Sequence, residues 1–312
     1  MPGQAAAVIR NALGVEVVDW YQFDNRSAAL DRARWEELPS RVEDNVERLL
    51  ALFRLRRVTA TFFVLGWLAD RLPEMVHKIT SAGHEIASLG YSNLRIDQQQ
   101  PDEFRDDLIC AKAILENLTG REVTGYRAPD FSLTQKTPWA HAAICDAGYR
   151  YSSSVQPLLS LRTPRKGAVL PPRFPYRAKD GLLEIPQSSI RLLGRTVPIN
   201  SGTRFRMLPY ETSRWMIHRL NEVDRSPLLF HLRAWEIDPA QPKAPGLDLT
   251  TRIEHYAGLR RNFWHLDRLL QDFSWGRIDD TFADQIASSL PSWRRALPAP
   301  RSLSELRMGS QQ

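Results

Sequence analysis

Strand-like and helix-like blocks alternate along this 312-residue chain, and the alternation limits its possible folds more than any other feature. Apolar, β-branched runs predict buried strands, and apolar residues at helical spacing predict amphipathic helices. The expected strands span 12–18, 60–65, 85–88, 124–127, 149–152 and 227–232, and the expected helices span 41–55, 70–82, 101–118, 137–147, 211–223 and 251–270. Repeated βα units require a parallel sheet covered by helices. The pattern therefore predicts an α/β fold, a distorted (β/α) barrel with any site at the carboxyl ends of its strands.

A proline- and arginine-rich stretch over 158–198 interrupts the βα rhythm. It predicts loops and short strands, and the loop-rich insertion that contains it extends to about residue 210. We expect a single domain over 11–290, with an N-terminal extension over 1–10. The remaining segment, 291–312, is rich in proline, serine and arginine, which is typical of a flexible tail.

Charge and cysteine content exclude several classes of protein. The chain has 42 Lys and Arg against 36 Asp and Glu, a formal net charge of +6, but the two signs interleave. Without a basic run or a recognition motif, we expect no nucleic-acid partner. The arginine excess instead favours anionic sugars or phosphates, which guanidinium binds bidentately. No apolar run approaches the ~20 residues of a membrane span. With two cysteines and no visible secretory signal, the expected location is the cytoplasm.

Five segments carry motifs that occur together in one known family. They are Asn11–Trp20, Val58–Trp67, Gly83–Ser88, Gly125–Pro129 and Ala234–Pro239. In residue types and in order, these segments resemble the polysaccharide deacetylases of the NodB-like carbohydrate esterase family. Within it they are most similar to the branch found in exopolysaccharide loci linked to exosortase sorting. The resemblance extends over most of residues 11–275 and implies the α/β barrel of that family.

The resemblance also implies a chemistry, the hydrolysis of an N-acetyl or O-acetyl group on a sugar. In the family, one Asp and two His hold a zinc-like ion, and the metal makes its bound water acidic enough to attack the acetyl carbonyl. A second Asp acts as base and a His near the C-terminal end as acid. An Arg-x-Pro segment lines the groove, and it reads Arg127-Ala128-Pro129 in this chain.

Both metal-binding histidines of the family are replaced in this chain. The family segment Ser-His-Gly-Tyr-x-His reads Ser-Leu-Gly-Tyr-Ser-Asn at 88–93. Leu89 has no lone pair to donate, and Asn93 offers only a weak carbonyl oxygen. Asp19 remains as the metal-side carboxylate, whereas Val18 occupies one position of the base. We therefore expect no bound metal and no other cofactor.

The catalytic acid of the family is replaced as well. The segment Leu-His-Pro-Trp-Glu reads Leu-Arg-Ala-Trp-Glu at 232–236, and the pKa of an arginine, above ~12, prevents Arg233 from delivering a proton. His231 lies two residues earlier and faces the same side of a strand. It is either a relocated acid or ligand, or a core histidine, which is the commoner case. Glu16 and His231 are thus the candidate catalytic residues. The histidines on predicted helices away from strand ends are assigned to packing or the surface: His77, His141, His218, His255 and His265.

A saccharide groove is expected at the strand ends. Its candidate residues are Asp19, Tyr91, Arg127, Pro129, Arg233 and Trp235. Asp19 is open to three interpretations: a remnant ligand, a hydrogen-bond acceptor for the sugar, or a cap at the strand end. Arg127 is either a groove residue or a structural partner that replaces the metal charge beside Asp19, with Arg233 entering the same site. Aromatic rings such as that of Trp235 stack on sugars, although core packing is their commoner fate.

Two hypotheses about function follow. In the first, the chain is a pseudoenzyme that has lost metal-dependent deacetylation and binds a saccharide, possibly an anionic one, or a partner enzyme in exopolysaccharide or cell-envelope carbohydrate metabolism. It depends on the joint loss of both metal histidines, one base position and the acid. In the second, the chain is an active carbohydrate N- or O-deacetylase, a hydrolase of C–N bonds other than peptide bonds. Its rewired site would use Asp19, Glu16, His231 and zinc or a similar divalent metal. The fold alone does not decide between them.

Overall fold

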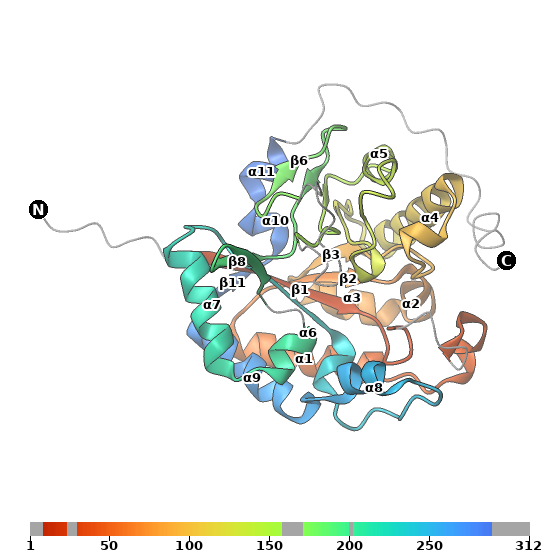
Figure 1. Cartoon of the computed structure of the whole chain (residues 1–312). Coiled ribbons are helices and arrows are strands. Elements are labelled where there is room, and N and C mark those ends of the chain that lie inside the picture. The colour runs from red at the N-terminus through yellow and green to blue at the C-terminus, as the bar shows by residue number, and fades with distance from the viewer. Residues whose placement is uncertain (1–8, 24–29, 158–170, 200–201, 289–312) are drawn as a thin grey trace, which may run out of the picture.

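The computed structural model describes residues 9–23, 30–157, 171–199 and 202–288, and a curled, mostly parallel sheet lies at its centre (Figure 1). The strands are β1 (Arg10–Val17), β2 (Thr61–Val64), β3 (Glu85–Ser88), β4 (Gly125–Tyr126), β5 (Tyr151–Ser152), β6 (Tyr176–Arg177), β7 (Leu183–Glu184), β10 (Leu229–Arg233) and β11 (Ser274–Gly276). They lie in the order β10-β1-β2-β3-β4-β5-β7-β6, and β11 pairs with β1 outside this path. Only β6 runs antiparallel to its neighbour among these described strands. The predicted α/β fold class is confirmed, and the sheet curls into a half-barrel.

Helices cover the outside of this sheet (Figure 1). They are α1 (Val42–Arg56), α2 (Gly66–Arg71), α3 (Pro73–Ser81), α4 (Pro101–Thr119), α5 (Ala140–Asp146), α6 (Gly202–Met207), α7 (Tyr210–Glu222), α8 (Leu249–Tyr256), α9 (Leu259–Asp272), α10 (Ile278–Thr281) and α11 (Ala283–Ala287). From β1 to β4, each strand is followed by at least one helix, so the predicted βα alternation is present in this part of the structure.

Strand β1 lies between β10 and β2 and is buried on both faces. Its apolar residues from Ala12 to Val17 are fully buried, as is usual for a parallel strand covered by helices on either side. Glu16 is the acidic residue in this apolar run, and its side chain lies near the carboxyl end of the strand. The carboxyl ends of β1, β2, β3, β4 and β10 meet along one edge of the sheet, where ligands bind in folds of this kind.

The helix expected over 70–82 is two helices in the structure, α2 and α3. They are separated at Leu72, whose backbone lies at φ −127° and ψ 58°. Pro73 has no N–H to continue the α2 ladder, and its ring disfavours a helical conformation at the preceding residue. The proline therefore ends one helix and begins the next.

The helix expected over 251–270 is also two helices, α8 and α9, which are separated at Ala257 and Gly258. Gly258 adopts the left-handed region at φ 76°, where a side chain would collide with the backbone of Arg206. The buried guanidinium of Arg206 donates hydrogen bonds to the carbonyls of Glu254, His255 and Ala257 at the end of α8. This long-range cap replaces the intrahelical bonds that α8 lacks at its end.

The interrupted stretch after residue 157 contains the short strands that were predicted for it. β6 and β7 extend the main sheet beside β5, and β8 (Ser189–Leu192) pairs with β9 (Arg195–Pro198) as a separate hairpin. The beginning of the insertion, 158–170, lies outside the described residues, as do 1–8 of the expected extension and the whole expected tail. Among the residues that the structure describes, no helix has the length and apolar character needed to span a membrane.

Candidate functional site

Asp19 follows β1 and caps a helix rather than facing a cavity. Its Oδ2 accepts hydrogen bonds from the Ser40 hydroxyl (2.6 Å) and from the backbone N–H groups of Arg41 (2.9 Å) and Val42 (3.2 Å) at the start of α1. Its Oδ1 accepts a hydrogen bond from the N–H of Trp20. Burial raises the pKa of Asp19, although these donors oppose the rise. The Asp19 side chain is fully buried. Its hydrogen bonds are those of a cap, which was one of the three interpretations, although the element that it caps is the start of α1.

Glu16 is the carboxylate to which two arginines converge. Its Oε1 lies 3.2 Å from Nη1 of Arg127, and its Oε2 lies 3.2 Å from Nε of Arg233. Arg233 is the register partner of Glu16 on β10, and Arg127 follows β4. Of the two interpretations of Arg127, neither matches this arrangement in full: Arg127 is a buried structural partner, but of Glu16, because the Asp19 carboxylate is already bound at the N-terminus of α1. We call Glu16, Arg127 and Arg233 the ion cluster.

The ion cluster is buried and charged. Burial raises the pKa of Glu16, but Arg233 and Arg127 outweigh it, so the pKa of Glu16 lies below its ordinary value. Arg127 is 1% exposed, its guanidinium lies 4.2 Å from the ring centre of Phe63, and it donates hydrogen bonds to the Ser153 carbonyl and hydroxyl. A buried guanidinium needs such partners, since a charge without them is strongly unfavourable in the interior.

The residues at the family's metal positions lie beside the ion cluster and do not fit a divalent cation. Leu89 and Asn93 line, with Glu16, a cavity of about 10 Å³, which is about the space of one water molecule. The Asn93 side-chain N–H donates to the Gln22 carbonyl at 2.6 Å. Both Glu16 oxygens face guanidinium groups, whose charge opposes a cation. Within the described ranges, no group of three His, Cys, Asp or Glu side chains could hold a metal ion.

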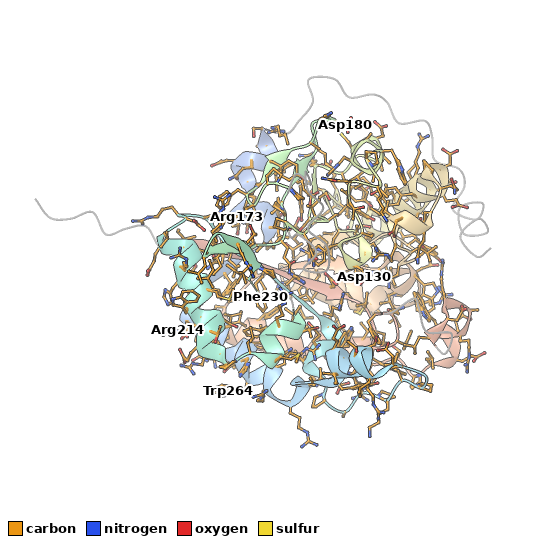
Figure 2. The ribbon with its side chains drawn as sticks, viewed as in Figure 1. Asp130, Arg173, Asp180, Arg214, Phe230 and Trp264 are labelled. Carbon is orange, nitrogen blue, oxygen red and sulfur yellow. The ribbon has the colours of Figure 1, made fainter. Side chains whose placement is uncertain are left out.

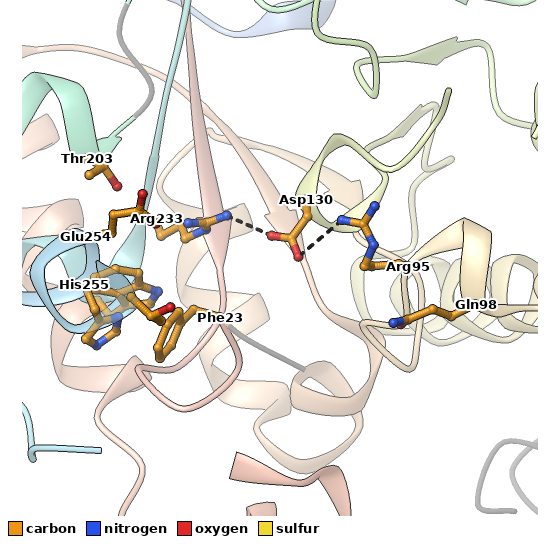
Figure 3. A pocket seen from close by; sticks show the side chains of 10 residues that line it. Phe23, Arg95, Gln98, Asp130, Thr203, Arg233, Glu254 and His255 are labelled. Carbon is orange, nitrogen blue, oxygen red and sulfur yellow. Dashed lines mark hydrogen bonds and ion pairs between the residues drawn. The ribbon is translucent and has the colours of Figure 1, made fainter. Parts of the chain in front are cut away.

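Arg233 and Asp130 line three adjoining cavities at this edge of the sheet. The largest has a volume of about 530 Å³, which lies within the usual range for small-molecule sites of about 300–1,000 Å³. Figure 3 shows Asp130 between the guanidinium groups of Arg233 and Arg95, each of which it pairs with across the cavity. Neutral polar groups on the walls come from Gln98, Thr203 and Thr251, and Glu254 adds a carboxylate.

Three predicted groove residues line these cavities, and three do not. Arg233 and Trp235 line the largest cavity, and Pro129 lines the smallest. Arg127 lies behind Glu16 and Asp19 lies at the start of α1, as described above. The Tyr91 ring is 2% exposed and packs where a Cβ on Gly66 would meet it. The Tyr91 N–H donates to the buried carboxylate of Asp107, so this residue supports the loop after β3.

An aromatic stack forms one wall of the largest cavity. The His255 ring packs against both Phe23 and Trp235, with centroid distances of 3.9 and 4.1 Å and interplanar angles of 28° and 29°, and the Phe23 and Trp235 rings are themselves 5.8 Å apart. Burial, with Arg206 nearby, lowers the pKa of His255 to about 3, so the ring is neutral. The assignment of His255 to a helix away from the strand ends is wrong, because the break at Gly258 lets α8 run along the cavity.

His231 lies on β10 and lines the second cavity, which has a volume of about 160 Å³. Its ring is 5.1 Å from that of Phe131 in an edge-on arrangement. Burial, with Arg127 nearby, lowers the pKa of His231 to about 3. The imidazole is thus neutral at neutral pH and holds no readily released proton.

Sequence reasoning did not single out Asp130, Arg95, Phe23 or His255 as site residues. They belong to loops and to α8, and the motif segments do not include them. The one available signal was the adjacency of Asp130 to the Arg-x-Pro segment.

Family models match two consecutive parts of the chain. The polysaccharide deacetylase model matches residues 30–152, and a domain of unknown function, DUF3473, matches residues 153–283. Residues 30–152 are thus similar to the polysaccharide deacetylase family, although β1 and β10 of the same sheet lie outside this match. The largest cavity is built from both parts, since Arg95 and Asp130 belong to the first and Arg233 and His255 to the second.

Curated relatives match over shorter stretches. A peptidoglycan deacetylase of Helicobacter pylori is 29% identical over 113 residues, which cover 36% of this chain and 38% of that protein. A peptidoglycan-N-acetylglucosamine deacetylase of Bacillus cereus is 33% identical over 82 residues, covering 26% of this chain and 30% of that protein. The chain thus matches about a third of the length of each of these relatives.

Solved structures share the fold over nearly the whole chain. A protein of Mycobacterium smegmatis assigned as a polysaccharide deacetylase is 18% identical with a TM-score of 0.58, over 96% of this chain and 97% of that one. An allantoinase is 16% identical with a TM-score of 0.56, over 92% and 93% of the two chains. At these identities the likeness shows the fold alone, and the shared fold does not determine the substrate.

Proposed function

We propose that this chain, which is similar to the polysaccharide deacetylase family over residues 30–152, binds a saccharide beside Arg233 and does not carry out metal-dependent deacetylation. Its place is in exopolysaccharide or other cell-envelope carbohydrate metabolism. The observation that carries the proposal is the ion cluster, in which Glu16 lies 3.2 Å from both Arg127 and Arg233. This cluster occupies the edge of the sheet where the resemblance puts a metal ion and a catalytic acid.

The charge of the ion cluster supports the loss of the metal. A zinc ion requires several lone pairs that converge on one point and are not already bound to cations. Glu16 is paired twice. Asp19 accepts four hydrogen bonds, three from the residues around the start of α1 and one from the N–H of Trp20. A divalent ion beside Glu16 would also meet two fixed positive charges at short range, which is unfavourable in a buried site.

The titratable groups support the loss of the acid. Burial lowers the pKa of Arg233, but Glu16, Asp130 and Glu236 outweigh it, so Arg233 keeps its proton at every physiological pH. A general acid needs a pKa near the working pH. The neutral ring of His231 is equally unsuited, because its pKa of about 3 leaves it without the extra proton.

The largest cavity supports saccharide binding. A sugar ring has apolar C–H faces and a rim of hydroxyl groups, so it fits a site with aromatic rings and scattered neutral hydrogen-bonding groups. Phe23 is partly exposed and supplies the ring that a sugar can contact, with the buried rings of His255 and Trp235 packed against it. Gln98 and Thr203 are among the polar groups.

Metal content and acetate release test the catalytic half of the proposal. Purified protein is incubated with one equivalent of zinc, dialysed and assayed by elemental analysis and with an acetylated chito-oligosaccharide. We expect zinc well below one equivalent and no acetate release above the buffer rate. Stoichiometric zinc, with hydrolysis that Glu16→Gln or His231→Ala abolishes, would instead establish the rewired deacetylase.

Calorimetric titration with a panel of neutral and acidic oligosaccharides tests the binding half. Phe23→Ala removes an outer ring of the stack and should weaken binding several-fold. Trp264→Ala is the matched control, because Trp264 is 58% exposed on α9 and lies away from Asp130 and its cavity (Figure 2). If no oligosaccharide binds, the saccharide half of the proposal is wrong.

A further inference from the structure

We infer that the saccharide bound at this site carries a carboxylate, and that this carboxylate displaces Asp130 from its place between Arg95 and Arg233. The inference rests on the proposed function and names the class of ligand for the same site. That class is an acidic sugar, with its carboxylate either on the ring, as in a uronic acid, or on an ether substituent such as a lactyl group.

Asp130 is held in the way that an anionic ligand would be. Its Oδ1 lies 3.2 Å from Nη2 of Arg233, and its Oδ2 lies 3.9 Å from Nη1 of Arg95 (Figure 3). The two guanidinium groups come from β10 and from the segment before the short helix at Ile96–Gln98, so they approach the carboxylate from different sides. Paired guanidinium groups select planar carboxylates. A carboxylate-binding position therefore exists in the cavity, and the chain fills it with its own side chain.

The backbone that carries Asp130 is strained. Asp130 and Phe131 both lie at φ 50°, in the left-handed region, within the short helix at Pro129–Phe131. Non-glycine residues adopt this region at a cost in free energy, and such strain gathers at ligand sites and in switching segments. The Asp130 side chain is also 37% exposed, so it already borders solvent. Because of these two features, a ligand carboxylate can replace the carboxylate of Asp130 between the two arginines.

The surrounding charges favour a single negative charge on the ligand. Glu16 stands behind Arg233, Asp97 pairs with the far side of Arg95 at 2.9 Å, and Glu254 lines the same cavity. These carboxylates oppose a doubly charged phosphate. A carboxylate that takes the place of Asp130 leaves the charge between the two arginines unchanged, so the exchange needs no extra cation.

The rest of the cavity fits the remainder of an acidic sugar. The partly exposed ring of Phe23, supported by the buried rings of His255 and Trp235, lies on a wall of the same cavity whose other walls carry Arg95 and Arg233. A pyranose ring placed against these aromatic rings has its hydroxyl groups within a cavity that also presents Gln98, Thr203 and Thr251. The carboxylate is then the group that orients the sugar.

Titration calorimetry on the full-length chain tests this inference with two matched pairs of ligands. Tetragalacturonate is compared with its methyl ester, and the disaccharide of N-acetylglucosamine and N-acetylmuramic acid with diacetylchitobiose. We expect the wild-type chain to bind one acidic member more tightly than its neutral counterpart, and the pair that responds distinguishes a ring carboxylate from a lactyl ether. Asp130→Asn should tighten binding of that acid by about tenfold or more and leave the neutral counterpart unchanged.

Matched variants separate displacement from a general charge effect. Asp97→Asn removes a charge from beside Arg95 at a position outside the cavity, and it should change acid binding much less than Asp130→Asn. Asn tolerates the left-handed region, and Asp130→Gly, which suits it better, provides a second test if the Asn variant folds poorly. Equal binding of acid and neutral sugars overturns this inference and leaves the proposed saccharide site intact. Weaker or unchanged acid binding by both Asp130 variants also overturns it, and failure of every sugar to bind removes both proposals.

Discussion

Two buried glutamates at opposite ends of the central sheet are stabilised in opposite ways. Glu16 lies near the carboxyl end of β1 and is paired with the guanidinium groups of Arg127 and Arg233. Glu85 is the first residue of β3, at the amino end of the sheet. It is hydrogen-bonded by the hydroxyls of Thr61 (2.5 Å) and Tyr151 (2.8 Å), with no cation paired to it among the described residues.

The two carboxyl groups consequently differ in charge at neutral pH. Burial raises the pKa of both, but the two arginines lower that of Glu16 below its ordinary value. Burial and then the nearby carboxylate of Asp279 raise the pKa of Glu85 to about 8. At the amino end of the sheet, the buried carboxyl group of Glu85 is therefore protonated and neutral. At the carboxyl end, where the three adjoining cavities lie, the buried groups of the ion cluster are charged. Buried ion pairs contribute little net stability, so the ion cluster is not explained by a contribution to folding alone.

The largest expected effect comes from removing one cation from the ion cluster. Arg127→Met should lower the free energy of unfolding by about 3–5 kcal/mol, because it leaves Glu16 buried with a single partner. Denaturant unfolding followed by circular dichroism measures the change. Arg34→Met is the matched control, since Arg34 pairs with Glu37 on the surface, and exposed pairs contribute about 0–1 kcal/mol.

A second substitution shows whether the loss comes from the uncompensated charge. Glu16→Gln added to Arg127→Met should recover part of the lost stability, because the buried carboxylate is then neutral. If the double variant is no more stable than Arg127→Met, the loss comes from packing against Phe63, and the electrostatic contrast between the two glutamates is wrong.

Glu85 should produce a dependence of stability on pH above about pH 5, whereas Glu16, whose pKa is lowered, contributes only at more acid pH. Its folded-state pKa of about 8 lies above the unfolded value, so the folded chain holds a proton that the unfolded chain releases. Stability from this group is therefore complete below the unfolded pKa of about 4.3 and falls as the pH rises toward 8, by at most about 1.4 kcal/mol per pH unit. Glu85→Gln should flatten this part of the curve of unfolding free energy against pH.

The control for Glu85→Gln is another acid on the same side of the sheet. Asp280→Asn removes a carboxylate that pairs with Arg277 and does not contact Glu85, and it should leave the slope between pH 5 and 8 unchanged. An equal slope in the wild type and in Glu85→Gln would show that Glu85 is ionised in the folded chain.

Much of the fold follows from local pattern, because helical and strand periodicities are set by burial on one face or two. The strand at 85–88 and the start of α4 at Pro101 are predicted to the residue. The errors occur where a distant residue decides the outcome. Nothing local to Gly258 indicates that Arg206 will cap α8 there, and this cap separates the helix predicted over 251–270 into two.

The candidate site was predicted in part, and the missing part has a physical reason. Resemblance located Arg233 and Trp235, which the structure places on the cavity wall. It could not show that Glu16 rather than Asp19 meets the arginines, since the two lie three residues apart at the end of one strand. Asp130 and His255 reach the cavity through a left-handed loop and a helix end, neither of which has a periodic signal.

The smallest expected effect concerns the neighbour of Glu85. Asp279→Asn removes the negative charge that, after burial, raises the pKa of Glu85, so that pKa should fall while staying above the ordinary value. The folded chain then releases the Glu85 proton at a lower pH. The pH at which the unfolding free energy stops falling should therefore decrease, by less than about one pH unit, which corresponds to about 1.4 kcal/mol.

Unfolding curves at pH 5 to 9 measure this end point, and Asp280→Asn again serves as the control. The end point is compared rather than the absolute stability, because Asn at 279 also loses the 2.9 Å ion pair with Arg277. An unmoved end point would mean that burial alone keeps Glu85 protonated, and that the contrast with Glu16 depends only on the arginines.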